Sequence, residues 1–488
     1  MRSLLTANAE LVITIVKIAL LLFIVLTVNA YLTWFERKVV AHIQSRWGPH
    51  RVGPHGLLQP MADGLKFLFK EDPTPAGVDK FVYYLAPLLA LALALTSIAI
   101  IPFGPEPLHL FGHDIYLGIA PLDLNIGILA LFAITALGVY GVALAGWSSN
   151  SKYPLLGGLR SSAQMVSYEL ALTMSVVGVL LMAGSFNLRD IINAQARHPE
   201  WGIFGWNLWP QVLGFFCFFT AAVAETNRVP FDLPEAESEL VAGFHTEYAS
   251  FKFAMFFIAE YTSMITVSCL CTIMFFGGWL SPFPASWTIT HYLPSVILIP
   301  FGLWVIMDGL RYETAFGRVI LPGVGAVLAA LGLALIVLPH QFNDFIQAPF
   351  WFLSKVLVFL FVYVWMRGTL PRFRYDQLMD LGWKWMLPAA LINIVVTALG
   401  VGVIQGLDGW RGMHTIDSLS SGLGLTATGK VIAIVIGVGN LFLTAGIMSL
   451  INRRSRDFNL KKQRRQIKLV DLPKGKPAVM PASPESAA

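Results

Sequence analysis

The chain has 488 residues and a net charge of +5; 56% of its residues are apolar, only 13% are charged, and the mean hydropathy is +0.66. A soluble protein carries about 25% charged residues, and a disordered chain lacks this density of apolar ones. The composition therefore excludes an ordinary soluble enzyme and a disordered protein. It predicts an all-α, polytopic membrane protein.

Apolar segments long enough to cross a bilayer recur along the whole chain. A spanning helix needs about 20 apolar residues. This criterion predicts about 11 transmembrane helices, at 11–33, 81–101, 122–146, 163–184, 210–226, 252–279, 292–310, 322–338, 350–366, 386–405 and 426–451.

Motifs typical of metal and nucleotide sites are missing from the sequence. The three cysteines, Cys217, Cys269 and Cys271, are not spaced as a metal or redox pair. The glycine-rich motifs that bind nucleotide phosphates are also absent. We therefore expect no metal site and no bound nucleotide in this chain.

Basic residues are divided unequally between the two sides of the predicted membrane. Of the 34 Lys and Arg residues, 27 fall in loops on one side and 4 in loops on the other. Because positively charged loops remain in the cytoplasm, this bias predicts an outer N-terminus and a cytoplasmic C-terminus in the cell inner membrane. It also accounts for the net charge without a nucleic-acid surface. Lys17 and Lys355 lie near the outer ends of their spans, where snorkelling to the interface would accommodate them.

Residues 57–70 are too short to cross the bilayer but have two distinct faces. On a helix, the apolar residues fall within a sector of about 120°, and the polar ones cluster opposite. This pattern predicts an amphipathic helix in the cytoplasmic interface, preceded by a turn-rich loop at 48–54. Two interpretations stay open: the helix only anchors the loop, or it guides an amphiphile from the bilayer toward a cavity.

The segment Glu225–Glu247 is acidic although it lies on the basic side of the membrane. It holds one strong base, Arg228, and six acids: Glu225, Asp232, Glu235, Glu237, Glu239 and Glu247. Pro230 and Pro234 exclude a regular helix at its start. Irregular backbone near the membrane requires surrounding protein or water, so we expect this loop to line a cavity.

Two further acids, Glu169 and Glu260, lie inside predicted spans. At 1.5 Å per residue they are about 10–12 Å below the cytoplasmic face. Ionisable groups at such depth are costly and usually belong to ion or proton pathways. Together with the acidic loop they indicate a half-channel that takes up protons from the cytoplasm. The alternative is that these acids form structural ion pairs with Arg228, Arg160 or Lys252.

Several motifs occur in the same order as in a known family. They are Glu36-Arg37-Lys38, R-x-G-P-x-x-x-G-P-x-G-L-L-Q-P at Arg46–Pro60, GWSSNSKY at Gly146–Tyr153, Ser167-Tyr168-Glu169, AETNRVPFDLPEAESELVAGF at Ala224–Phe244, Ala259-Glu260-Tyr261 and PRFRYDQL at Pro371–Leu378. On these motifs the chain resembles the H subunit of bacterial complex I and its mitochondrial counterpart, NADH dehydrogenase subunit one. The resemblance covers approximately residues 11–280 and 350–405.

The resemblance implies a membrane subunit of a proton-translocating NADH:quinone oxidoreductase. The subunit would join the hydrophilic arm of the complex to the membrane arm and form much of the chamber for its substrate, a quinone. NADH, FMN and the iron–sulfur clusters would be bound by partner subunits. The chain alone would then hold no complete active site.

The same resemblance assigns two groups of residues. The quinone path would be lined by Glu36, Arg37, Arg46, Asp63 and Arg228. The route that couples quinone reduction to proton translocation would begin with Glu169, Glu225, Glu235, Glu237, Glu239 and Glu260.

The chain departs from the family's eight-helix pattern in two places. Residues 281–349 insert what we expect to be a helical hairpin, with Arg311 and Arg318 in its turn. A further span and a basic, partly disordered cytoplasmic tail follow the core. The predicted organisation is a membrane core at 1–280 with a quinone-portal loop at 34–80 and an acidic loop at 225–247, the inserted hairpin at 281–349, the last two core helices at 350–405, an extra helix at 406–451 and the tail at 452–488.

Two other functions are compatible with a chain of this kind. A homologous subunit of a membrane-bound hydrogenase need not bind quinone, but the complete interfacial-helix loop favours the quinone enzyme. A stand-alone cation/proton antiporter would be expected to have paired broken spans in two related halves. We detect no such repeat in the sequence.

Overall fold

The computed structural model describes residues 2–105, 108–110, 113–115, 124–197, 199–232, 243–284, 287, 289–312, 314–337, 340–410, 431–432, 434–447 and 449. The chain divides into two units, Met1–Asn440 and Leu441–Ala488. In the second unit the structure describes residues 441–447 and 449, and residues 441–447 are the last part of an apolar helix, Ile434–Ile447. The residues of the candidate site belong to the first unit.

The described part of the first unit is almost entirely helical, which confirms the all-α class. Its long helices are α1 (Arg2–Ile43), α3 (Lys80–Ala99), α4 (Gly127–Ser148), α5 (Lys152–Ala183), α7 (Val212–Glu225), α9 (Ser250–Phe275), α10 (Ile289–Leu310), α11 (Ala315–Val337), α12 (His340–Thr369) and α14 (Leu387–Trp410). The shorter elements are η1 (Pro54–Gly56), α2 (Gln59–Phe69), α6 (Leu188–Ala196), η2 (Pro199–Gly205), η3 (Gly243–His245), α13 (Tyr375–Asp380) and η4 (Leu381–Met386). One small antiparallel hairpin pairs β1 (Leu108–Leu110) with β2 (His113–Ile115).

Among the described residues, nine helices are long and apolar enough to cross a membrane. They coincide with nine of the eleven predicted spans, so the chain is a multi-pass membrane protein. The spans expected at 210–226 and 426–451 correspond to two shorter apolar helices, Val212–Glu225 and Ile434–Ile447. The count of eleven therefore stays a prediction.

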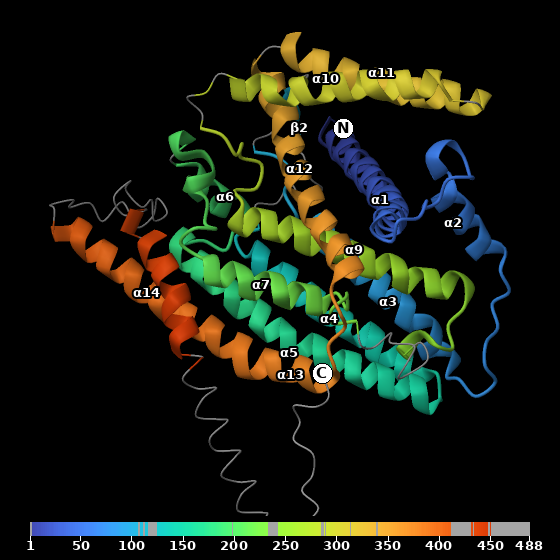
Figure 1. Ribbon diagram of the computed structural model, residues 1–488, viewed down its shortest axis with the longest axis horizontal. Helices are drawn as coiled ribbons and strands as arrows, with labels where there is room; N and C mark the ends of the chain where they lie inside the picture. The colour runs from blue at the N-terminus through green and yellow to red at the C-terminus, as the bar shows by residue number, and fades with distance from the viewer. Residues whose placement is uncertain are drawn as a thin grey trace, which may run out of the picture. The chain divides into compact units, whose positions relative to one another are not determined.

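Helix α9 is the centre of the bundle (Figure 1). It packs against α3, α7 and α12, while α4 and α5 extend the layer beyond α3. Most of its side chains are buried, whereas the other spanning helices turn much of their apolar surface outward. Small residues permit close approach elsewhere: a Cβ atom on Gly141 of α4 would lie 2.8 Å from the Cβ of Ala90 on α3.

Helix α1 contacts the bundle along a narrow stripe. Its buried residues Val25, Asn29, Leu32 and Glu36 recur at spacings of four, three and four, which place them on one helical face. The Asn29 amide donates a hydrogen bond of 2.7 Å to Thr262 on α9. The helix continues past the predicted end of this span at residue 33, to Ile43. Glu36 therefore lies on a buried helix face rather than in a loop.

The predicted amphipathic helix is present as α2. Its apolar face is not buried in the described part of the chain: Leu68 is 64% and Phe69 is 87% exposed. Such a face is suited to the membrane interface. The hydroxyl group of Ser250, at the start of α9, donates hydrogen bonds of 2.6 and 3.0 Å to the carbonyl groups of Phe67 and Lys70, which hold the end of α2.

Lys355 corrects one expectation. Instead of snorkelling to the interface, its ammonium group points inward from α12 and donates hydrogen bonds to the carbonyl groups of Phe276, Gly278 and Leu280, at 2.7, 2.9 and 2.6 Å. It also lies 4.2 Å from the centre of the Trp206 ring. The last carbonyl groups of a helix have no partners within the helix, and the helix dipole favours a cation there. Lys355 thus satisfies the backbone that follows α9.

Candidate functional site

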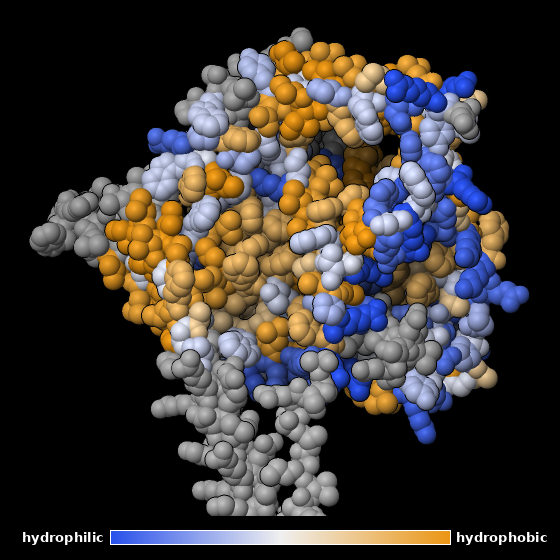
Figure 2. Space-filling model, viewed as in Figure 1, coloured by the Kyte–Doolittle hydropathy of each residue, from blue (hydrophilic) through white to orange (hydrophobic). Residues whose placement is uncertain are grey.

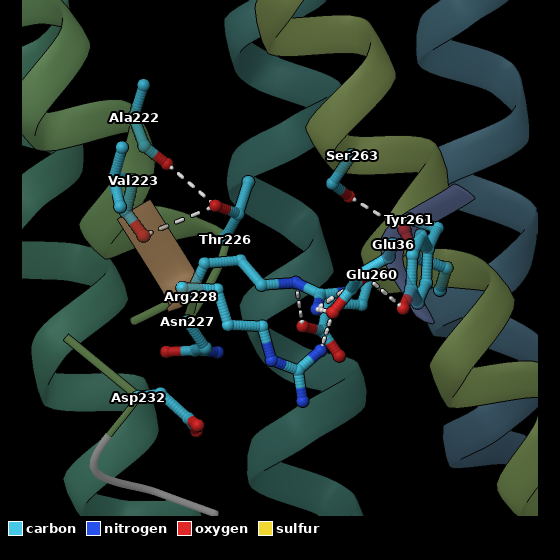
Figure 3. A network of polar contacts seen from close by, with 12 residues as sticks. Glu36, Ala222, Val223, Thr226, Asn227, Arg228, Asp232, Glu260, Tyr261 and Ser263 are labelled. Carbon is cyan, nitrogen blue, oxygen red and sulfur yellow. Dashed lines mark hydrogen bonds and ion pairs between the residues drawn. The ribbon is translucent and has the colours of Figure 1, made fainter. Parts of the chain in front are cut away.

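A cluster of charged side chains lies between α1, α9, α12 and the loop that follows α7 (Figure 3). Its centre is the buried carboxylate of Glu36. Arg228 donates hydrogen bonds of 3.4 and 3.5 Å to the two oxygens of this carboxylate, and the Tyr261 hydroxyl group donates one of 2.6 Å. Arg367, at the end of α12, also pairs with the Glu36 carboxylate. Four segments far apart in sequence therefore meet at one acid.

Arg228 links Glu36 to a second acid. Its Nε atom lies 2.7 Å from a carboxylate oxygen of Glu260 on α9. Its guanidinium carbon lies 4.2 Å from the centre of the Tyr261 ring, a cation–π contact. The two acids and the two arginines balance in charge, which a buried cluster requires because an uncompensated buried charge is strongly destabilising.

The backbone after α7 is shaped so that Arg228 reaches this cluster. Thr226 ends the helix, its hydroxyl group donating to the carbonyl groups of Ala222 and Val223 (Figure 3). Asn227 then adopts a left-handed conformation, with φ = 50°, which reverses the chain. Asn is among the residues that tolerate this conformation best.

Two neighbouring segments hold the same loop in place. The buried amide of Gln164 on α5 donates hydrogen bonds of 2.8 and 3.0 Å to the carbonyl groups of Ala224 and Phe231. On the other side, the Phe373 N–H group donates to the Pro230 carbonyl at 3.1 Å, and the Phe231 and Phe373 rings stack. The irregular backbone predicted for this segment is thus present from Thr226 to Asp232, where it is enclosed by protein, as the membrane requires.

A cavity of about 90 Å³ adjoins the cluster. Its lining includes both Glu225 and Glu260, together with Thr226, Asn227 and His245, among aromatic and aliphatic side chains from α3, α4 and α9. Burial lowers the pKa of His245 to about 4, so this imidazole is neutral at physiological pH. Of the acids that the sequence predicted for a half-channel open to the cytoplasm, Glu225 and Glu260 line this cavity.

Glu169 and Glu225 form a second acidic pair. They lie on α5 and at the end of α7, both are half-buried, and their carboxylates interact electrostatically. Glu225 also lines the cavity that contains Glu260. Three of the predicted coupling acids therefore follow one another from α5 through α7 to α9. The other three, Glu235, Glu237 and Glu239, lie outside the described residues.

The remaining predicted quinone-path residues, Arg37, Asp63 and Arg46, lie on α1, on α2 and on the connection between these helices. Arg37 pairs with Asp63 of α2 at 2.6 Å, and the Gln59 amide donates a 3.0 Å hydrogen bond to the same carboxylate. This pair fastens α2 to α1, with the Arg37 side chain 53% exposed. Arg46 follows α1 and is exposed. Of the five residues, the structure brings Glu36 and Arg228 into one contact and Arg37 and Asp63 into another.

Sequence reasoning missed two members of the cluster. Arg367 was counted only among the basic loop residues, because the predicted span ended at residue 366, whereas α12 continues to Thr369. Tyr261 stands next to Glu260 in a motif, but nothing in the sequence indicated that its hydroxyl group reaches an acid 225 residues away. No group of three or more metal-ligating side chains occurs among the residues that the structure describes.

The fold and the site define a polytopic membrane protein with a charge-balanced cluster buried among its helices. The family model for NADH dehydrogenase matches residues 16–398. The H subunit of an NADH-quinone oxidoreductase from Solibacter usitatus is 49% identical over 389 residues, which cover 79% of this chain and 96% of that protein. The corresponding protein from Koribacter versatilis is 48% identical (80% and 97% covered), and one from Geobacter metallireducens is 44% identical (80% and 96%).

The chain therefore belongs to the NADH dehydrogenase family, among relatives named as H subunits of NADH-quinone oxidoreductase. The resemblance drawn from the sequence motifs is confirmed. The names of the relatives make them subunits of an oxidoreductase, and the spanning helices of this chain make it a membrane subunit.

Proposed function

We propose that this chain, with partner subunits, forms the quinone-binding chamber of NADH:quinone oxidoreductase and couples quinone reduction to proton translocation. In this proposal FMN and the iron–sulfur clusters belong to partner subunits, and no complete active site lies in this chain. The N-terminus is outside and the C-terminus is in the cytoplasm.

The quinone part of the proposal rests on α1, α2 and the charged cluster. The exposed apolar face of α2 provides a surface along which an amphiphile can leave the membrane interface. The Arg37–Asp63 pair fixes α2 beside the segment of α1 that carries Glu36. Arg46 and Asp63 remain candidates for this path because both lie on the connection between α1 and the end of α2.

The coupling part rests on the cavity lined by Glu225 and Glu260, the observation that carries the proposal. Reduction of a quinone to a quinol consumes protons as well as electrons, so a chamber for this reaction needs proton-holding groups within reach. Acids buried at membrane depth are suited to this task. Glu169, Glu225 and Glu260 would carry protons inward, and Glu235, Glu237 and Glu239 would belong to the same route.

Arg228 gives the two parts a physical connection. It pairs with Glu36 on one side and with Glu260 on the other, at 3.4 and 2.7 Å. A guanidinium group shared between two acids responds to the charge of each, because protonating one acid frees the arginine for the other. A change of charge beside Glu36 would in this way alter the proton affinity of Glu260.

The test is to neutralise Glu225 and Glu260 separately in the assembled complex. Glu225→Gln and Glu260→Gln should each lower the rate of NADH-driven quinone reduction and the accompanying proton translocation in liposomes. Glu200→Gln is the matched control, because Glu200 is an exposed acid outside the cavity. Wild-type rates and an unchanged ratio of protons to electrons in both cavity variants would remove these acids from the mechanism.

A further inference from the structure

The helical hairpin α10–α11, which is additional to the eight-helix pattern, contacts the loop between α1 and α2. We call this loop, residues 44–58, the entrance loop. The Nε2 atom of His55 lies 2.8 Å from a carboxylate oxygen of Asp308 at the end of α10. The backbone N–H group of His55 donates a 3.0 Å hydrogen bond to the hydroxyl group of Tyr312, in the turn of the hairpin. Its ring meets the Tyr312 ring edge to face, with centroids 5.2 Å apart.

His55 has a backbone conformation that needs external support. Its φ angle is 51°, in the left-handed region that is sterically unfavourable for a residue with a side chain. Such conformations persist where the surrounding structure determines them by several contacts. Here a third hydrogen bond adds support, because the Trp34 indole of α1 donates a 3.3 Å hydrogen bond to the His55 carbonyl.

The backbone of the entrance loop has little freedom to rearrange around His55. Gly56 follows with φ = 80°, and a Cβ atom there would collide with the carbonyl group of Pro49. Tyr312 is itself held, since Arg318 donates a 2.8 Å hydrogen bond to its carbonyl group. The contact between loop and hairpin is therefore a defined joint, and Trp34 connects it to α1 two residues before Glu36.

The rest of the hairpin packs mainly on itself and only lightly on α12. Figure 2 shows a hollow between the hydrophobic band over α10 and α11 and the remainder of the bundle, at the place where α1 runs in Figure 1. Helices α1 and α11 each expose large apolar side chains, including Phe23 of α1 (69% exposed) and Val319 of α11 (73% exposed). Hydrophilic residues border the hollow at one end in Figure 2, on the side where the loop before α2 runs in Figure 1.

We propose that the hairpin extends the quinone entrance: it forms an outer wall beside α1 for the isoprenoid chain of a membrane quinone, and Asp308 and Tyr312 position the entrance loop through His55. This inference rests on the proposed function. The isoprenoid chain is the occupant that the geometry favours, because the hollow runs beside the apolar surface of α10 and α11 and extends toward the loop that connects α2 to the helix of Glu36.

The test compares two quinones in the purified complex reconstituted into liposomes. One is a long-chain quinone confined to the bilayer, and the other is a short-chain, water-soluble analogue. The double variant Asp308→Asn/Tyr312→Phe should raise the KM for the long-chain quinone about three- to tenfold, which corresponds to losing one or two hydrogen bonds. The KM for the short-chain quinone and kcat for both should stay at wild-type values.

Two further variants separate a positioning role from a loss of structure. His55→Asn removes the imidazole contacts but retains a residue that tolerates the left-handed conformation, so it should reproduce the selective rise in KM. Arg311→Gln changes an exposed residue of the same turn and should leave both KM values unchanged. The polypeptide composition of each purified complex verifies assembly.

Several outcomes would overturn the inference. Unchanged KM values in the joint variants, or equal losses with both quinones, would contradict a role in quinone entry. A loss of copurified phospholipid with unchanged KM values would assign the hollow to a phospholipid instead. The proposed function is tested separately: if Glu225→Gln and Glu260→Gln impair both quinones while the joint variants do not, only the inference about the hairpin fails.

Discussion

Replacing Glu36 by Gln probes the charged cluster at its centre. The substitution keeps the size of the side chain but removes the carboxylate that Arg228, Arg367 and Tyr261 share. Glu260 is then the one acid that remains in the cluster, so the cluster carries a net positive charge from Arg228 and Arg367. The folded chain should become less stable, because it cannot neutralise this charge internally.

The structure sets the expected size of the effect. Removing one partner of a buried ion pair costs about 3–5 kcal/mol. The Arg367 side chain is 40% exposed and can turn part of its charge to water, whereas that of Arg228 is only 8% exposed. We therefore expect a loss near the lower limit, about 3 kcal/mol in the free energy of unfolding.

The assay is unfolding of the full chain in detergent micelles by titration with SDS, followed by circular dichroism. Arg37→Gln is the matched control on the same helix. Its pair with Asp63 is half-exposed, and exposed ion pairs contribute about 0–1 kcal/mol, so its midpoint should barely move.

A double-mutant cycle makes the test specific. Arg367→Met added to Glu36→Gln restores charge balance, and the two changes should show a coupling energy of about 1–3 kcal/mol. Strictly additive effects, or a loss below about 1 kcal/mol for Glu36→Gln alone, would refute the account of the cluster as a charge-balanced unit.

Two other substitutions test separate features. Lys355→Met removes the cation from the carbonyl groups that follow α9 and should lower the unfolding free energy by about 2–3 kcal/mol. Lys17→Met is the control and should have little effect. Equal midpoints of the two variants in the SDS titration would contradict the buried role of Lys355. For His245, burial lowers the pKa to about 4 from the ordinary 6.5, so the unfolded chain binds more protons between these two pH values. Stability should therefore fall as the pH drops through this window and stay constant above it, and His245→Gln should show a weaker pH dependence of the same unfolding midpoint.

Much of the architecture follows from local sequence patterns. Apolar runs identified the spanning helices, because the length of such a run is set by the bilayer and not by distant residues. The two-faced pattern of residues 57–70 located α2 for the same reason. Pro230, together with Pro234, indicated irregular backbone after α7, and two of the acids predicted at membrane depth, Glu225 and Glu260, line one cavity.

The tertiary structure alone decided which charges meet. Glu36 pairs with an arginine 192 residues away and with another 331 residues away, and no local pattern encodes such a choice. Lys355 lies in a span where snorkelling was expected, but the carbonyl groups that bind it belong to a segment about eighty residues earlier in the chain. The joint between His55 and Asp308 likewise joins the entrance loop to a hairpin 253 residues later. The hydropathy of a segment determines whether it crosses the membrane, whereas ion pairing depends on how the helices pack. Charge interactions require atoms within a few ångströms of each other, and only packing brings segments distant in sequence that close.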